Sequence, residues 1–176
     1  MVALLGAEST GKSTLSQALA DALVAAGREA EVVGEALREF CVEHRRTPGR
    51  DEQASIAREQ TGRIAAAARR SEIVVADTTA LMIAVYSDIV FEDPSLYEDA
   101  EAVQRTYALT LLTAIDLPWV ADGLQREGAH VQAPVDQRVR ASLERAQVAF
   151  EVVSGSGAAR LDAALAAVQF ALARQS

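Results

Sequence analysis

The sequence predicts an α/β domain built on a five-stranded parallel sheet. Short apolar runs of strand length alternate along the chain with longer stretches of helical composition. Such alternation implies parallel strands joined by right-handed helical crossovers. A glycine-rich turn after the first strand and an aspartate at the end of the third indicate where a functional site lies. The predicted strands lie near residues 2–5, 29–33, 72–76, 107–113 and 150–153.

The glycine-rich turn matches a phosphate-binding pattern. It reads Gly6-Ala7-Glu8-Ser9-Thr10-Gly11-Lys12-Ser13, which fits G-x-x-x-x-G-K-[ST] between a strand and a helix, a context that disfavours an ordinary turn of small residues. Glycines let the backbone approach a polyphosphate, so that successive N–H groups and the helix N-terminus face its oxygens. Lys12 is expected to reach the β- and γ-phosphates, and the Ser13 hydroxyl to bind Mg²⁺. The predicted nucleotide-binding residues are Gly6, Glu8, Ser9, Thr10, Gly11, Lys12, Ser13 and Thr14.

Composition limits the class of protein. The 176 residues are half apolar and 5% aromatic, which suits one domain over 1–176 with an aliphatic core. A formal net charge of −8 argues against general affinity for nucleic acid or an anionic membrane, because both need a basic surface. Cys41 is the only cysteine and is expected to be a small half-buried side chain rather than a catalytic thiol. The first strand begins at residue 2 and no apolar run reaches transmembrane length, so we expect a soluble cytoplasmic protein without a signal peptide.

Charged residues follow the second predicted strand. Glu35, Arg38 and Glu39 come directly after its carboxyl end. Ligands of open α/β sheets bind at this edge, so the three residues are candidates for contacting a phosphoryl acceptor. Glu35 and Arg38 are also spaced i, i+3, which on a helix gives a surface ion pair. Sequence position alone favours neither interpretation.

The third predicted strand ends in an aspartate. Residues 72–77 read EIVVAD, the form of a Walker B strand, so we expect Asp77 to lie beside Mg²⁺ and the phosphate loop. The alternative is that Asp77 caps the next helix. Thr78 and Thr79 can make that cap instead, which leaves Asp77 for the metal site.

Capping signals and apolar stripes predict the helices. Gly27 is expected to end the helix that follows the phosphate loop. Ser95 is expected to cap a helix that runs to about Gln104. The remaining helices are expected at residues 51–70, 79–90, 134–150 and 158–173.

A polar loop with the only tryptophan follows the fourth strand, and a short lid is expected around 116–130. Asp116 and Asp122 are candidates for contacts with a substrate hydroxyl or a metal-bound water. Arg126 is a candidate for closing over the transferred phosphate. The alternative is that Trp119 anchors the loop in the core and the charged side chains are solvated.

Five segments resemble one kinase family. GAESTGKSTL, VGEALREF, VVADTTAL, LPWVADGLQREG and FEVVSGSGAARL together resemble the ribosylnicotinamide kinase domain of NadR-type proteins, in the P-loop kinase superfamily. The resemblance covers about residues 2–173, and the PW-x-x-DG stretch is its most specific part. It implies a P-loop NTPase fold with strand order 2-3-1-4-5, and transfer of the γ-phosphate of ATP, with Mg²⁺, to the 5′-hydroxyl of a nucleoside. The nucleotidyltransferase domain of bifunctional members has no counterpart here, so a stand-alone kinase is expected.

The resemblance assigns roles by position. Glu35 and Asp77 flank the acceptor hydroxyl, and the general base is left open between them. The implied catalytic residues are Lys12, Glu35, Asp77 and Arg126. The implied substrate-binding residues are Glu35, Arg38, Asp77, Trp119 and Asp122, and the implied metal ligands are Ser13 and Asp77.

Two departures from the family pattern bear on the acceptor. The family usually has aromatic residues on both sides of Glu35, where this chain has small ones. A platform for stacking on a nicotinamide ring is then expected from Trp119, Tyr86 or Phe40. The lid arginine also stands one residue later than usual, at Arg126. A kinase for a different small acceptor and a nucleotide-binding accessory or regulatory ATPase are therefore the alternatives, and the alanine-rich helices fit either a monomer or a homo-oligomer.

Overall fold

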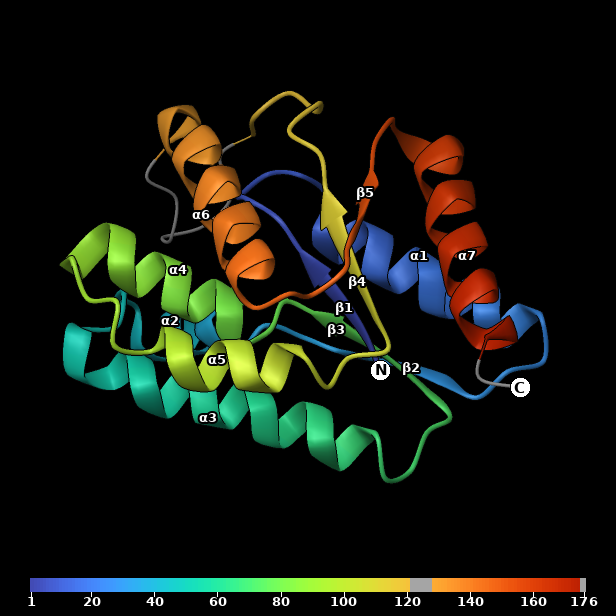
Figure 1. Cartoon of the computed structure of the whole chain (residues 1–176), viewed down its shortest axis with the longest axis horizontal. Helices are drawn as coiled ribbons and strands as arrows, with labels where there is room; N and C mark the ends of the chain where they lie inside the picture. Colours follow the sequence, from blue (N-terminus) through green and yellow to red (C-terminus); the bar gives the residue numbers. More distant parts are fainter. Residues whose placement is uncertain (121–127, 175–176) are drawn as a thin grey trace.

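A five-stranded parallel sheet organises the chain (Figure 1). The computed structural model describes residues 1–120 and 128–174. Neighbouring strands follow the order β2-β3-β1-β4-β5, which confirms the predicted order. The strands are β1 (Val2–Leu5), β2 (Ala30–Val33), β3 (Ile73–Asp77), β4 (Leu109–Thr113) and β5 (Glu151–Val153). Each strand overlaps the range that the sequence predicts for it.

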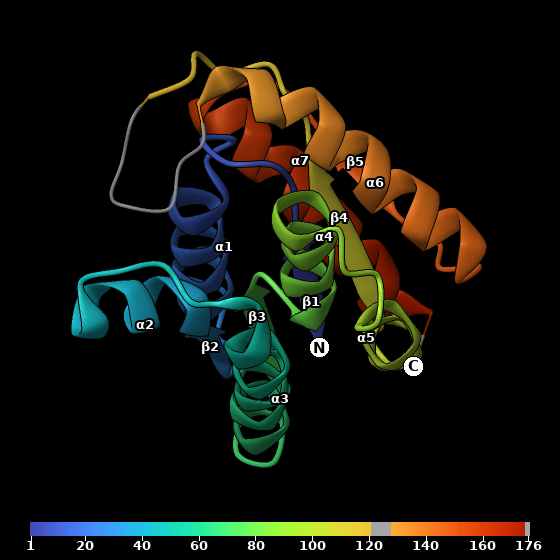
Figure 2. The same ribbon diagram turned by 90° about the vertical axis from the view of Figure 1, so that its left-hand side faces the viewer.

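Helices cover both faces of this sheet (Figures 1 and 2). α1 and α7 pack together on one face, and α3, α4, α5 and α6 lie on the other. α2 packs on α3 beside the carboxyl edge of the sheet. The helices are α1 (Lys12–Ala25), α2 (Ala36–His44), α3 (Arg50–Ala67), α4 (Ala80–Phe91), α5 (Tyr97–Gln104), η1 (Ala129–Val131), α6 (Gln132–Arg145) and α7 (Gly157–Ala173).

The central strands are buried on both faces, which explains why they are continuous apolar runs. Successive side chains of a strand point to opposite faces. Leu4 therefore packs against Leu19 of α1, and Leu5 packs against Leu81 of α4. Burying a leucine fully contributes about 2 kcal/mol, and these four leucines are 0% exposed. The fold is thus held by aliphatic side chains, as the low aromatic content predicts.

Two predicted helix boundaries are wrong. Ser95 does not cap α5: the cap position is Leu96, and the Ser95 N–H instead donates to Oδ1 of Asp93 at 3.1 Å. The helix predicted over 134–150 ends at Arg145, because Gln147 takes a left-handed conformation with φ 55°. The Val148 N–H then donates to the Leu143 carbonyl at 2.9 Å, the pattern of a Schellman motif. Glutamine is not a usual residue at that position, so the sequence carries no stop signal there.

The predicted end of α1 and the predicted cap of α4 agree with the structure, whereas α3, predicted over 51–70, already ends at Ala67. Gly27 follows α1 with φ 83°, and the Arg28 N–H donates to the Leu23 carbonyl at 3.0 Å. Thr79 caps α4 by accepting from the Leu81 N–H at 3.3 Å, as expected. In the described part of the chain, no helix is both long enough and apolar enough to cross a membrane.

Candidate functional site

The phosphate-loop residues lie between β1 and α1, at the carboxyl edge of the sheet. Three residues of the loop have positive φ angles: Gly6 (147°), Ser9 (58°) and Gly11 (77°). A Cβ on Gly6 would overlap the Thr113 hydroxyl at the end of β4 and lie 3.2 Å from the Thr113 carbonyl oxygen. Both glycines of the pattern are thus required by the backbone, and Gly6 also by close packing.

Side chains hold this loop from within. The Thr10 hydroxyl donates to the Ala7 carbonyl at 2.8 Å and lies 2.7 Å from the Thr113 hydroxyl. The Thr113 hydroxyl also lies 3.1 Å from the Leu5 carbonyl oxygen. Lys12 Nζ donates to the carbonyls of Gly6 and Ala7 at 2.8 and 2.7 Å. The ammonium group therefore lies over the loop, where the phosphates of a bound nucleotide would be.

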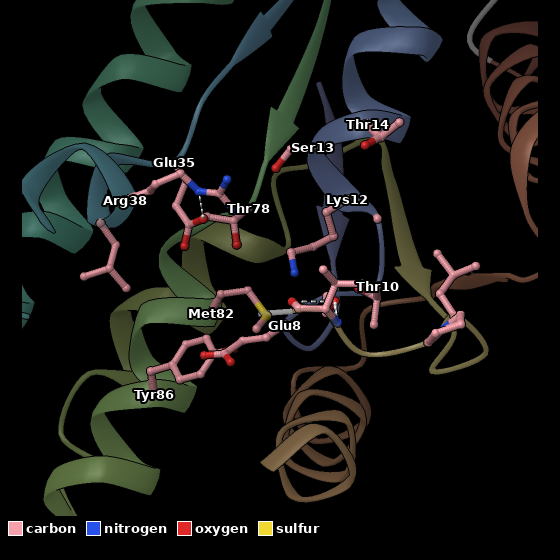
Figure 3. Close-up of a pocket in the computed structure, with 16 residues that line it drawn as sticks. Glu8, Thr10, Lys12, Ser13, Thr14, Glu35, Arg38, Thr78, Met82 and Tyr86 are labelled. Carbon is pink, nitrogen blue, oxygen red and sulfur yellow. Dashed lines mark hydrogen bonds and ion pairs between the residues drawn. The ribbon is translucent and has the colours of Figure 1, made fainter. Parts of the chain in front are cut away.

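A pocket of about 750 Å³ opens from the loop toward α2 and α4 (Figure 3). Figure 3 shows Lys12 reaching into it from one side and Glu35 from the other, with Met82 and Tyr86 of α4 along its wall. Its lining residues are Glu8, Ser9, Thr10, Gly11, Lys12, Ser13, Thr14, Glu35, Leu37, Arg38, Thr78, Met82, Tyr86, Leu117, Pro118 and Val120. Every predicted nucleotide-binding residue except Gly6 is among them.

Glu35 precedes α2 and brings a buried carboxylate to this pocket. Its side chain is 14% exposed, and Arg38 Nε lies 3.5 Å from its Oε2. Burial raises the pKa of the Glu35 carboxyl above its ordinary value; Lys12 opposes the rise, Asp77 adds to it and Arg38 opposes it. The ion pair and the pocket position, which the sequence left as alternatives, therefore occur together.

Asp77 ends β3 beside the phosphate loop. It pairs in register with Leu4 on β1 and is 5% exposed. Its Oδ1 is buried and has no hydrogen-bond partner among the described residues. A buried, unpartnered carboxylate oxygen suits Mg²⁺, a hard cation that prefers oxygen ligands. The described residues contain no group of three acidic, histidine or cysteine side chains able to hold a metal ion. Asp77 thus has the chemistry of a Mg²⁺ ligand, and its pairing with the Ser13 hydroxyl in one metal site stays a prediction.

Gln60 joins the Glu35 and Asp77 loops. This α3 side chain is 0% exposed. Its Oε1 accepts from the Ala36 N–H at 2.7 Å, and its Nε2 lies 3.1 Å from the Gly34 carbonyl oxygen and 3.3 Å from that of Thr78. The backbone partners fix the amide orientation, because an N–H can only donate and a carbonyl can only accept. Sequence reasoning missed Gln60, since a glutamine within a helix belongs to no motif.

The expected aromatic platform is only partly in the pocket. Tyr86 lines it, whereas Phe40 stacks on His44 with ring centroids 4.1 Å apart. Trp119 is half-buried between the lining residues Pro118 and Val120 but does not itself line the pocket. Leu37 and Met82, which no motif indicated, add apolar surface.

Three predicted site residues, Asp116, Asp122 and Arg126, belong to the segment that follows β4. Asp122 and Arg126 lie outside the described residues. Asp116, expected to contact a substrate hydroxyl or metal-bound water, instead pairs with Arg160 and accepts from the Gly155 N–H at 2.6 Å. The expectation for Asp116 is therefore corrected, because both of its carboxylate oxygens bond to groups of the protein.

Comparison with known proteins places the chain in a family. A family model described as "AAA domain" matches residues 1–160. A search of curated proteins finds no significant match. The fold is similar to a solved structure of NadR in complex with NAD and AMP-PNP, with TM-score 0.73, 20% identity, and coverage of 98% of this chain and 49% of that one. It is also similar to NadR in complex with NR, with TM-score 0.76, 19% identity, and coverage of 96% of this chain and 48% of that one.

These similarities confirm the resemblance to NadR-type proteins at the level of the fold. The chain spans about half the length of the NadR chains that it matches. A parallel sheet of order 2-3-1-4-5, a glycine-rich loop after its central strand and a family match over 160 residues lead to one conclusion. This protein belongs to the AAA domain family and has the P-loop NTPase fold.

Proposed function

We propose that this chain is an ATP-dependent kinase that phosphorylates the 5′-hydroxyl of nicotinamide riboside or a related nucleoside. The observation that carries the proposal is the shape of the site. One pocket has a phosphate loop with Lys12 on one side and the buried carboxylate of Glu35 on the other. Solved NadR structures of the same fold hold NR in one case and NAD with AMP-PNP in the other, which supports a nucleoside and a nucleotide as the two substrates.

On the nucleotide side, the loop N–H groups and Lys12 bind the β- and γ-phosphates. Ser13 and Asp77 would hold Mg²⁺, and the bound cation would supply positive charge to stabilise the phosphate oxygens. Gly6 and Gly11 keep the loop backbone close to the phosphate oxygens. Removal of Lys12 takes away a charge that acts mainly on the transition state, a loss of about 3 kcal/mol or more.

On the acceptor side, a carboxylate takes the hydroxyl proton while the acceptor oxygen bonds to the γ-phosphorus. The bond from that phosphorus to the β,γ-bridging oxygen breaks, and ADP leaves. Glu35 and Asp77 remain the two candidates for the proton acceptor. The raised pKa of Glu35 favours it as the base, because a base whose pKa approaches the working pH transfers protons more effectively. Leu37, Met82 and Tyr86 offer apolar surface for the nucleoside base.

The first experiment is a product assay. Purified protein is incubated with MgATP and a panel of nucleosides that includes nicotinamide riboside, and products are identified by mass. A riboside monophosphate, absent with Lys12→Ala, is the expected result. Acceptor-independent release of ADP and phosphate would instead favour an accessory ATPase.

A second experiment uses the single lysine of the sequence. Lys12 is the only lysine among 176 residues, so an amine-reactive reagent has one side-chain target. We expect MgATP to protect Lys12 from acylation, with peptide mapping to separate it from the amino terminus. Labelling that is equally fast with and without MgATP would contradict the nucleotide site.

Some expectations stay predictions. They concern the roles of Asp122, Arg126 and Trp119, a lid around 116–130, the single-domain assignment, cytoplasmic location, formation of a homo-oligomer and the absence of nucleic-acid binding.

A further inference from the structure

Arg160 is buried near the N-terminus of α7, where a positive charge does not stabilise the helix. Among the described residues it is the only buried arginine, with a side chain 4% exposed. It lies in the first turn of α7, which begins at Gly157. A positive charge in a first turn is unfavourable, because the helix N-terminus already carries partial positive charge. Burial of an arginine also costs free energy unless its donors are used. The position therefore needs another explanation.

The guanidinium joins three loops. Its NH1 donates to the carbonyl of Thr10 in the phosphate loop. Its NH2 donates to the Ala114 carbonyl at 3.3 Å and to Oδ1 of Asp116, both in the segment after β4. Oδ2 of Asp116 accepts from the Gly155 N–H at 2.6 Å, which adds the turn after β5. The carboxylate thus orients the guanidinium toward the phosphate loop.

The hydrogen bond to Thr10 fixes a peptide that matters for phosphate binding. No described peptide bond is cis, and in a trans peptide the C=O and N–H point in opposite directions. A Cβ on Gly11 would lie 3.6 Å from the Arg160 guanidinium and 3.1 Å from Leu117, so this side of Gly11 is closed by side chains. With the Thr10 carbonyl directed at Arg160, the Gly11 N–H is directed away from Arg160, and Gly11 is one of the residues that line the pocket.

We propose that Arg160, oriented by Asp116, is a positioning residue that holds the Thr10–Gly11 peptide with its N–H facing the phosphates of the bound nucleotide. The role rests on the proposed function, since it requires that the loop bind a polyphosphate. Arg160 does not touch the nucleotide in this role. Its effect is on phosphate binding and is independent of the base of the nucleotide.

The test compares Arg160→Met and Arg160→Lys with the wild type. Methionine keeps much of the side-chain length and removes every donor, and the Asp116 left behind is 34% exposed and can be solvated. Lysine keeps the charge but cannot form the two-pronged fork. Arg145→Met is the control for loss of an arginine–carboxylate pair, because Arg145, whose side chain is 54% exposed, pairs with Glu101 away from the phosphate loop. Binding of MgATP and of inorganic tripolyphosphate is measured by calorimetry at a temperature where each variant is folded.

We expect Arg160→Met to bind both ligands about tenfold more weakly, which corresponds to one hydrogen bond to a charged group. Arg160→Lys should fall between Arg160→Met and wild type, and Arg145→Met should bind like wild type. In ¹⁵N-glycine-labelled protein without ligand, the Gly11 amide resonance should shift in Arg160→Met and not in Arg145→Met.

Each other outcome overturns the proposal in a recognisable way. Wild-type affinity of Arg160→Met for both ligands would refute the positioning role and leave the nucleotide site intact. Loss of ATP binding with unchanged tripolyphosphate binding would move the role of Arg160 to the nucleoside part. If Arg145→Met lost as much affinity for both ligands as Arg160→Met, the loss would reflect general destabilisation of the protein and not the contact with Thr10. Failure of the wild type to bind either ligand would instead overturn the proposed function, and this role with it.

Discussion

Replacing Gln60 by leucine should unlink the two carboxylate loops and destabilise the protein measurably. The amide makes three hydrogen bonds, at 2.7, 3.1 and 3.3 Å, to the backbone of Ala36, Gly34 and Thr78, of which the first and third are buried and the second is partly buried. Leucine fills most of the same volume, so the main loss is three unpaired backbone groups. At about 1 kcal/mol each, the low end for buried unsatisfied groups, the free energy of unfolding should fall by about 3 kcal/mol.

Urea unfolding followed by circular dichroism measures this loss. The control is Gln17→Leu on α1, where the exposed amide donates to Asp21 at 2.8 Å and the change should stay within about 0.5 kcal/mol. Turnover should also fall in Gln60→Leu, because Glu35 and Asp77 lose their common support. A loss below about 1 kcal/mol together with wild-type turnover would refute the reasoning.

Two further predictions concern the same site. Because the pKa of Glu35 is raised in the folded state, the folded protein binds more protons than the unfolded chain once the pH exceeds the ordinary carboxyl pKa, so this group lowers the free energy of unfolding as the pH rises further. The free energy of unfolding of Glu35→Gln, measured in urea, should therefore exceed that of wild type by more at pH 8 than at pH 4. The same difference at both pH values would contradict this prediction. Gly6→Ala should cost about 2 kcal/mol or more and abolish nucleotide binding, because φ is 147° and the new methyl overlaps the Thr113 hydroxyl. Its control, Gly62→Ala within α3, has nothing within 4 Å of the new Cβ and should gain about 0.5–1 kcal/mol in thermal or urea unfolding; equal behaviour of the two alanine variants would refute the packing argument.

Structural features that depend on a local pattern of residues could be predicted from the sequence. The phosphate loop, the apolar central strands and the Thr79 cap each follow from residue types at fixed spacing. Features that depend on long-range contact are not visible in this way. Nothing near Gln60 in the sequence indicates that its partners lie 18 to 26 residues away, and nothing near Arg160 indicates that it bonds to Thr10, 150 residues away.

Boundary errors have the same origin. Gln147 adopts a left-handed conformation that glycine usually supplies, and Val148 and Phe150, just after it, pack against buried side chains of α4 and α6. Ser95 has the side chain of a good cap, yet Asp93, held by Arg50 at 2.9 Å, takes its N–H and moves the start of α5. In both cases the type of the residue alone does not indicate where the helix starts or ends.

The contact between Arg160 and the phosphate loop has a consequence for synthesis on the ribosome. Along this sequence the loop is translated before α7, and the guanidinium that bonds to Thr10 is made 150 residues after Thr10 itself. β1 likewise occupies the middle of the sheet and needs β3 and β4, both made after it. A nascent chain lacking α7 would then contain the complete glycine-rich motif without the hydrogen bond from Arg160 to the Thr10 carbonyl. Affinity for nucleotide should therefore reach its final value only when α7 has emerged, so ATP would stabilise the finished fold rather than guide its first steps.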